Sequence, residues 1–215
     1  MNILAISSKV PAAEKKGDQV VSFFRLTYLA RMGHAIEVIC FGDLQREEDR
    51  KARLILESAG IAVHFVKWSF WEAGWNLLGA MLGLSMPFQC ALYQSKKFSK
   101  MVDKASQRIK PDVLYCVMVR VAPNITAFNG KVWVEMVDSM GLNFSRRARL
   151  AKGPKRLLLD VERRRVSAFE KTLASRTERS FVVSNIDRNA IGSDRVRVVP
   201  LGIDTHLFRR GREIS

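Results

Sequence analysis

The chain has 215 residues, 47% of them hydrophobic, which suits one sizeable domain with a packed core and excludes a mostly disordered chain. Thirty-six Lys and Arg residues against 21 Asp and Glu give a net charge of +15, which favours acidic partners such as nucleic acid, anionic membranes or phosphorylated ligands. The three cysteines, Cys40, Cys90 and Cys116, are not spaced like the ligands of a metal site, and an odd number cannot form a closed set of disulfides. We therefore expect buried, reduced thiols and a cytoplasmic location.

Strands and helices are predicted to alternate along the chain. Apolar runs typical of strands covered on both faces predict strands at residues 2–7, 36–41, 61–66, 112–117, 132–137, 181–183 and 196–199. Helical spacing of apolar residues and helix-ending signals predict helices at residues 18–32, 46–58, 71–84, 95–110 and 154–175. The basic segment 143–155, with its Gly153–Pro154 pair, is expected to be a mobile loop.

Two apolar segments bear on membrane insertion. The run Ile3–Ile6 is too short for a signal peptide and is followed closely by Lys9. Residues 73–95 carry no charge, but Asn76, Gln89 and several Gly and Pro residues interrupt them. They therefore favour a buried or interfacial helix over a membrane span.

The alternation of strands and helices predicts an α/β fold. We expect a doubly wound, mostly parallel sheet with helices on both faces. Ligands of such sheets bind beyond the carboxyl ends of the strands. Among the residues at those ends are Lys9, Arg120, Asp138, Ser139 and Ser184.

The turn after the first strand runs from Ser8 to Gly17 and matches neither a dinucleotide fingerprint nor a P-loop. The start of a helix nonetheless suits a phosphate, because its backbone N–H groups are free and carry partial positive charge. Gly17 would let the backbone approach a ligand closely. A phosphate-binding turn and a solvated loop with Asp18 as helix cap both remain open.

Residues 133–140, WVEMVDSM, combine a buried strand with a carboxylate at the expected ligand edge. Asp138 can orient hydroxyl groups or act on a proton. The alternative is that Asp138 caps the next turn or pairs with an arginine.

The predicted helix at 154–175 places Leu159, Glu162 and Val166 on one apolar face. A carboxylate there needs a partner, for which we expect Arg163, Arg165 or a residue of the first turn. Residues 144–176 carry eleven Lys and Arg against three acids. This basic face is either solvated or rests on anionic lipid. The aromatic residues Trp68, Phe70, Trp71 and Trp75 add interfacial anchoring or belong to the core.

Several segments, in order along most of the chain, resemble family-4 glycosyltransferases of the GT-B fold. Residues 29–38, LARMGHAIEV, resemble an "L…GHEV" entry to the second strand, and residues 199–208, VPLGIDTHLF, resemble the hinge segment "VPNGVD…F". Residues 86–95 and the order Glu162, Glu170, Ser184 resemble a subgroup of bacterial exopolysaccharide sugar transferases. Leu201 stands where the hinge usually has Asn, and Phe169 replaces a tyrosine.

The resemblance implies that residues 1–200 are the N-terminal, acceptor-side, Rossmann-like half of a GT-B fold. Residues 201–215 would begin the hinge to a donor-binding domain that this chain lacks, so we expect the chain alone to be inactive. The implied enzyme is a retaining transferase that moves a sugar from a nucleotide sugar to a lipid-linked or polysaccharide acceptor without a metal or other cofactor.

In the resemblance, Asp138 is the residue that contacts the transferred sugar. The residues expected to bind substrate are Lys9, Gly17, Arg120, Ser139, Glu162 and Ser184. A cytoplasmic protein that contacts the inner face of the membrane would fit the basic surface.

Two other classes of function remain open. The charge also suits a nucleic-acid-binding module, but RNP, KH and zinc patterns are missing and aromatics do not alternate with the basic residues, so we expect no nucleic-acid partner. The second alternative is a stand-alone nucleotide-binding α/β domain.

Overall fold

The computed structural model describes residues 1–15, 17–83 and 86–202. These residues form a seven-stranded sheet in the order β3-β2-β1-β4-β5-β6-β7, in which every neighbouring pair is parallel. The strands are β1 (Asn2–Ser7), β2 (Ala35–Phe41), β3 (Ile61–Val66), β4 (Val113–Val117), β5 (Lys131–Val137), β6 (Arg179–Val182) and β7 (Val196–Val198). The predicted parallel α/β fold is confirmed.

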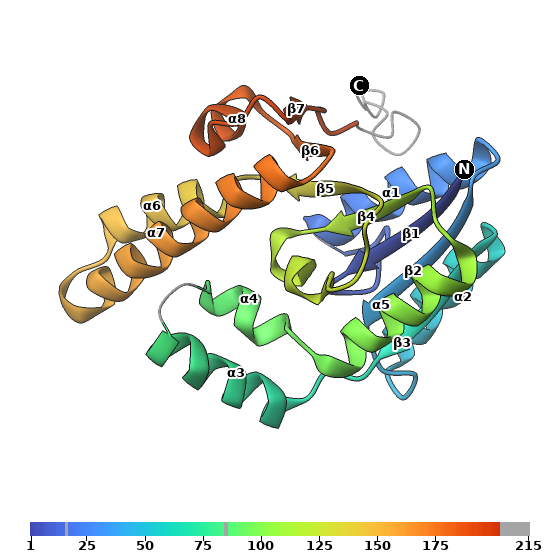
Figure 1. Cartoon of the computed structure of the whole chain (residues 1–215), viewed down its shortest axis with the longest axis horizontal. Coiled ribbons are helices and arrows are strands. Elements are labelled where there is room, and N and C mark those ends of the chain that lie inside the picture. Colours follow the sequence, from blue (N-terminus) through green and yellow to red (C-terminus); the bar gives the residue numbers. More distant parts are fainter. Residues whose placement is uncertain (16, 84–85, 203–215) are drawn as a thin grey trace, which may run out of the picture.

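The helices connect these strands and cover both faces of the sheet (Figure 1). They are α1 (Asp18–Arg31), α2 (Glu47–Ser58), α3 (Phe70–Gly83), α4 (Phe88–Tyr93), α5 (Lys96–Ile109), α6 (Met140–Leu150), α7 (Gly153–Arg176) and α8 (Asn185–Ile191), with a 3-10 helix η1 (Val119–Asn124) after β4. The strand order reverses between β1 and β4, so right-handed crossovers place α1 and α5 on opposite faces.

The central strands are buried on both faces, as their uninterrupted Val, Ile and Leu content requires. β4 is buried along its whole length, and β1 is buried after its first residue. Cys40, Cys90 and Cys116 are buried and free, as expected. Burial raises the pKa of each thiol, which keeps the three cysteines protonated.

The structure corrects the expectation that residues 143–155 form a mobile loop. Most of this segment belongs to α6 and to the first turn of α7. Met140, Phe144 and Ala148 follow one another at single-turn spacing and are all buried, and α6 packs closely on α7. The helix forms because these three residues give it an apolar face, although most of its other residues are polar or basic.

The start of α1 also differs from expectation. Gly17, with φ of 59°, occupies the N-cap position, and Asp18 is the first helical residue and makes no cap hydrogen bond. Asp18 pairs with Arg120 instead. Most of the predicted hinge segment, residues 201–215, lies outside the described residues. Among the helices of the described ranges, none combines the length and the apolar run that crossing a membrane requires.

Candidate functional site

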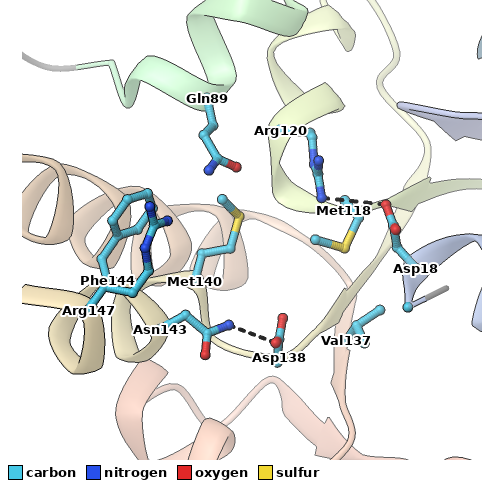
Figure 2. A pocket seen from close by; sticks show the side chains of 11 residues that line it. Asp18, Gln89, Met118, Arg120, Val137, Asp138, Met140, Asn143, Phe144 and Arg147 are labelled. Carbon is cyan, nitrogen blue, oxygen red and sulfur yellow. Dashed lines mark hydrogen bonds and ion pairs between the residues drawn. The ribbon is translucent and has the colours of Figure 1, made fainter. Parts of the chain in front are cut away.

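A cavity of about 310 Å³ lies where the carboxyl ends of β4 and β5 meet the start of α1 (Figure 2). We call it the edge cavity. It lies beside the point where the strand order reverses, which is where open parallel sheets bind ligands. Residues from five elements and the turns between them line it: Gly17, Asp18, Gln89, Met118, Arg120, Val137, Asp138, Met140, Asn143, Phe144 and Arg147.

Asp138 supplies the carboxylate of the edge cavity. The side chain is half-buried, and the Asn143 Nδ2 donates a hydrogen bond of 2.7 Å to its Oδ2. It does not cap α6, because Ser139 takes that position. Within the described ranges it forms no ion pair with an arginine either. The carboxylate therefore faces the cavity with one amide partner that fixes its orientation (Figure 2).

Arg120 supplies a cation on the opposite side of the same cavity. Its Nη2 lies 3.4 Å from Asp18 Oδ2, and both side chains are mostly buried. The guanidinium carbon lies 5.5 Å from the centre of the Tyr93 ring. Its buried Nε has no hydrogen-bond partner among the described residues. Among the described residues only Nη2 of the guanidinium has a hydrogen-bond partner, so Arg120 is held in place while its terminal nitrogens keep donor capacity, which suits a phosphate or carboxylate ligand.

Two strand ends beside the cavity hold strained backbone. Met118 has φ of 71° and Val137 has φ of 64°. Positive φ is rare for a residue with a side chain and most unfavourable for a β-branched one. Such strain persists where the surroundings enforce it, and it gathers at functional sites. Both residues line the edge cavity.

Glu135 enforces both strained turns. Its backbone oxygen accepts a hydrogen bond of 2.8 Å from the Met118 N–H, and its Oε1 accepts one of 3.3 Å from the Val137 N–H. The side chain is fully buried in the sheet, which normally excludes an isolated charge. Glu135 therefore positions the ends of β4 and β5 without touching the cavity.

The buried charge of Glu135 is matched from two sides. Arg25 of α1 forms an ion pair with it, and the Tyr115 hydroxyl donates a hydrogen bond of 2.9 Å to Oε2. Burial lowers the pKa of Arg25 and raises the pKa of Tyr115. Arg25 also donates to the Val199 carbonyl at 3.0 Å, which ties this pair to the segment after β7.

Glu162 of α7 lies beneath the cavity and supports α4. It is buried, and its two carboxylate oxygens accept hydrogen bonds from the Phe88 and Gln89 N–H groups at 3.0 and 3.3 Å. The expected partners, Arg163 and Arg165, bond elsewhere. That expectation is wrong because the free N–H groups of a helix start satisfy the carboxylate. Glu162 thereby fixes Gln89, which lines the cavity.

Glu170, two turns further along α7, supports the start of α6 in the way that Glu162 supports the start of α4. Its oxygens accept hydrogen bonds from the Met140 N–H at 2.6 Å, the Gly141 N–H at 3.3 Å and the Ser139 hydroxyl at 3.1 Å. Burial raises the pKa of Glu170 to about 7; these hydrogen bonds oppose the shift, and the charge of Asp138 adds to it. The two carboxylates make α7 a support for both helices that line the cavity.

The structure brings together three of the predicted site residues. Gly17, Arg120 and Asp138 line the edge cavity, whereas Ser139 and Glu162 lie buried behind it. Lys9 is exposed and lies outside the cavity lining, as does Ser184, whose hydroxyl accepts a hydrogen bond of 3.2 Å from the Asp187 N–H to start α8.

Sequence reasoning missed the contribution of α6. Asn143, Phe144 and Arg147 project from this helix into the cavity, and the Arg147 guanidinium carbon lies 5.2 Å from the centre of the Phe144 ring. The signal that could have found them is Ser139, which accepts a hydrogen bond of 3.2 Å from the Leu142 N–H as a helix cap. Gln89 was missed as well, because α4 is short.

Within the described residues, no group of three or more His, Cys, Asp or Glu side chains is placed to hold a metal ion. The chain matches no model of a known protein family. No curated protein matches it in sequence.

Proposed function

We propose that this chain is the N-terminal, acceptor-side domain of a retaining glycosyltransferase. The enzyme would move a sugar from a nucleotide sugar to a lipid-linked or polysaccharide acceptor. One observation carries the proposal: a fixed carboxylate (Asp138), a partly unsatisfied guanidinium (Arg120) and the start of α1 at Gly17 surround one cavity at the ligand-binding edge of a parallel sheet.

These groups match the chemistry of sugar transfer. A carboxylate held by Asn143 accepts hydrogen bonds from sugar hydroxyls and can orient a ring. Arg120 and the free N–H groups at the start of α1 suit the oxygens of a diphosphate. Such fixed donors stabilise the charge that develops on a diphosphate leaving group, so the reaction as proposed needs no metal.

The order of the family-like segments along the chain supports the acceptor-side assignment. In that arrangement a second domain binds most of the nucleotide sugar, and the edge cavity meets its diphosphate and transferred sugar across a cleft. The three buried thiols favour a cytoplasmic location.

The test is sugar transfer from a panel of labelled nucleotide sugars, with the complete reading frame and with residues 1–215 alone. We expect transfer by the complete protein and none by residues 1–215. Asp138→Asn in the complete protein should lower kcat/KM about 100-fold or more. Asp194→Asn, an exposed carboxylate away from the cavity lining, is the matched control and should have no effect.

Three outcomes would contradict the proposal. The first is transfer by residues 1–215 alone, and the second is an unchanged rate for Asp138→Asn. The third is tight binding of a free nucleotide by residues 1–215 with no transfer by the complete protein, which would favour a regulatory nucleotide-binding domain.

A further inference from the structure

Helix α3 turns its apolar side outward. Six large side chains between 47% and 83% exposed cover its outer surface, which we call the α3 face: Phe70, Trp71, Trp75, Leu78, Met81 and Leu82. Exposed apolar surface of this extent marks a binding site for a partner or a membrane. Trp71, Trp75, Leu78 and Leu82 recur at helical spacing, so they form one continuous stripe.

The polar side chains of α3 face the protein instead of the solvent. Glu72 accepts a hydrogen bond of 2.7 Å from the Lys96 N–H, and Asn76 donates one of 2.7 Å to the Gln94 carbonyl. The helix is therefore fastened through its polar side, and the apolar side is left free. This inverts the usual arrangement of a surface helix.

Helix α5 of the same protein has the usual arrangement. Both helices have 14 residues. α5 buries Phe98 and Val102 and exposes Lys97 and Lys104, as a helix in water does.

A basic segment lies at the same end of the molecule as α3 (Figure 1). Residues 146–158, which we call the α6–α7 tip, expose three leucines and six cations: Leu150, Leu157, Leu158, Arg146, Arg147, Arg149, Lys152, Lys155 and Arg156. Arg165, further along α7, holds this helix against α3, because it donates a hydrogen bond of 3.2 Å to the Ala80 carbonyl.

We propose that the α3 face and the α6–α7 tip dock the protein on an anionic lipid bilayer. A 14-residue helix is about 21 Å long, shorter than the roughly 30 Å apolar core of a bilayer. The helix therefore lies in the plane of the interface with its apolar side down. Its tryptophans suit the headgroup level.

Charge selects the bilayer as the occupant of this surface. Residues 144–176 carry eleven Lys and Arg against three acids, and two of those acids, Glu162 and Glu170, are buried. Anionic headgroups attract such a surface by about 1 kcal/mol per basic side chain. A symmetric pairing with a second copy would bring two basic tips together, which like charges oppose.

Docking would also bring the edge cavity close to the bilayer. α4 packs on α3 and supplies Gln89 to the cavity lining. A lipid-linked acceptor could then reach the cavity while its lipid stays in the membrane. The position of the acceptor depends on the proposed function, whereas the docking does not.

Vesicle co-sedimentation with residues 1–215 tests the docking. We expect binding to vesicles made of equal amounts of phosphatidylcholine and phosphatidylglycerol, with a blue shift of tryptophan emission. Trp71→Ser with Trp75→Ser should weaken binding about tenfold or more. The matched control, Leu54→Ser with Ile55→Ser, removes two exposed apolar side chains of α2 and should leave binding unchanged.

A second pair of variants tests the charge. Lys152→Gln, Lys155→Gln and Arg156→Gln together should weaken binding about tenfold or more. Arg46→Gln, Arg50→Gln and Lys51→Gln, at and near the start of α2, should have little effect.

Three results would overturn the docking. The first is binding to vesicles of phosphatidylcholine alone that is as strong as binding to the anionic vesicles. The second is unchanged vesicle binding by the double tryptophan variant. The third is that the protein does not bind vesicles and instead forms a dimer, which the double tryptophan variant abolishes. Vesicle binding and sugar transfer are measured separately, so failure of one leaves the other standing.

Discussion

The edge cavity and the α3 face use their side chains in opposite ways. Behind the cavity, buried carboxylates are tied to backbone N–H groups and to Arg25, and they hold strained turns and helix starts in place. On the α3 face, large apolar side chains are exposed and the described structure gives them few contacts. The side chains behind the cavity therefore stabilise the fold, whereas those of the α3 face are available for binding.

This difference has a thermodynamic meaning. Removing one partner of a buried ion pair lowers stability sharply, because the other charge stays buried without compensation for its desolvation. Exposed apolar residues contribute little to the free energy of unfolding whatever their size. Variants of the two regions should therefore separate stability from surface binding.

Among the buried carboxylates, the largest effect on stability is expected at Glu135. Glu135→Ala leaves the largely buried Arg25 without its ion-pair partner and releases the Val137 N–H. The free energy of unfolding should fall by about 3–4 kcal/mol, measured by urea denaturation. Glu135→Gln, which keeps the shape and one acceptor, should cost clearly less; equal losses would show that the charge alone accounts for the effect and that the retained acceptor contributes nothing.

The next effect concerns pH and Glu170. Its folded pKa of about 7 lies above the ordinary 4.5, so the folded carboxyl keeps a proton that the unfolded one releases. Its contribution to stability is complete below about pH 4.5 and is lost as pH rises to about 7, a loss on the order of 3 kcal/mol at most.

Glu170→Gln should remove this pH dependence. The amide oxygen can replace Oε1 as the acceptor of the Met140 N–H, and the amide nitrogen can replace Oε2 by donating to the Ser139 hydroxyl, with loss of the longer bond from the Gly141 N–H. Urea midpoints at about pH 4.5 and about pH 7.5 should therefore differ less for the variant than for the wild type. The same difference in both proteins would contradict the raised pKa.

A smaller effect is expected at Glu162. Glu162→Ala removes the acceptor of two N–H groups at the start of α4 and should cost about 1–2 kcal/mol. Hydrogen exchange should show faster opening of α4. If exchange increased in α6 instead, the assignment of separate supports to the two helices would be wrong.

The smallest effect is expected on the α3 face. Trp75→Ser should change the free energy of unfolding by about 0.5 kcal/mol or less, because the side chain is 72% exposed. Phe98→Ala in α5, which removes a fully buried aromatic ring, should cost about 4 kcal/mol. A large loss for Trp75→Ser would show that the α3 face packs against the protein.

The fold was predictable because its signals are local. Apolar runs such as Val113–Val117 identify buried strands, and alternation with helices implies a parallel sheet. α6 was missed although its Ser139 cap is a local signal. The rest of its first turn is satisfied by Glu170, which lies 30 residues further along the chain and cannot be recognised as a partner in a local window.

The site was predictable only in part. Asp138 and Arg120 follow predicted strands, and ligands of parallel sheets bind at the carboxyl ends of the strands. Their position near the cavity could therefore be predicted. Ser139 and Glu162 were expected to bind substrate, but their side chains bond within the protein. Glu135 could not be found, because a carboxylate inside a strand says nothing about Arg25, which reaches it from another helix.

The most direct test of the proposed function is the rate of sugar transfer from a labelled nucleotide sugar by the complete protein, wild type against Asp138→Asn. We predict measurable transfer by the wild type and a loss of about 100-fold or more in the variant, with vesicle binding unchanged. Equal rates for the two proteins, or no transfer from any nucleotide sugar, would contradict the assignment of the edge cavity to a glycosyltransferase.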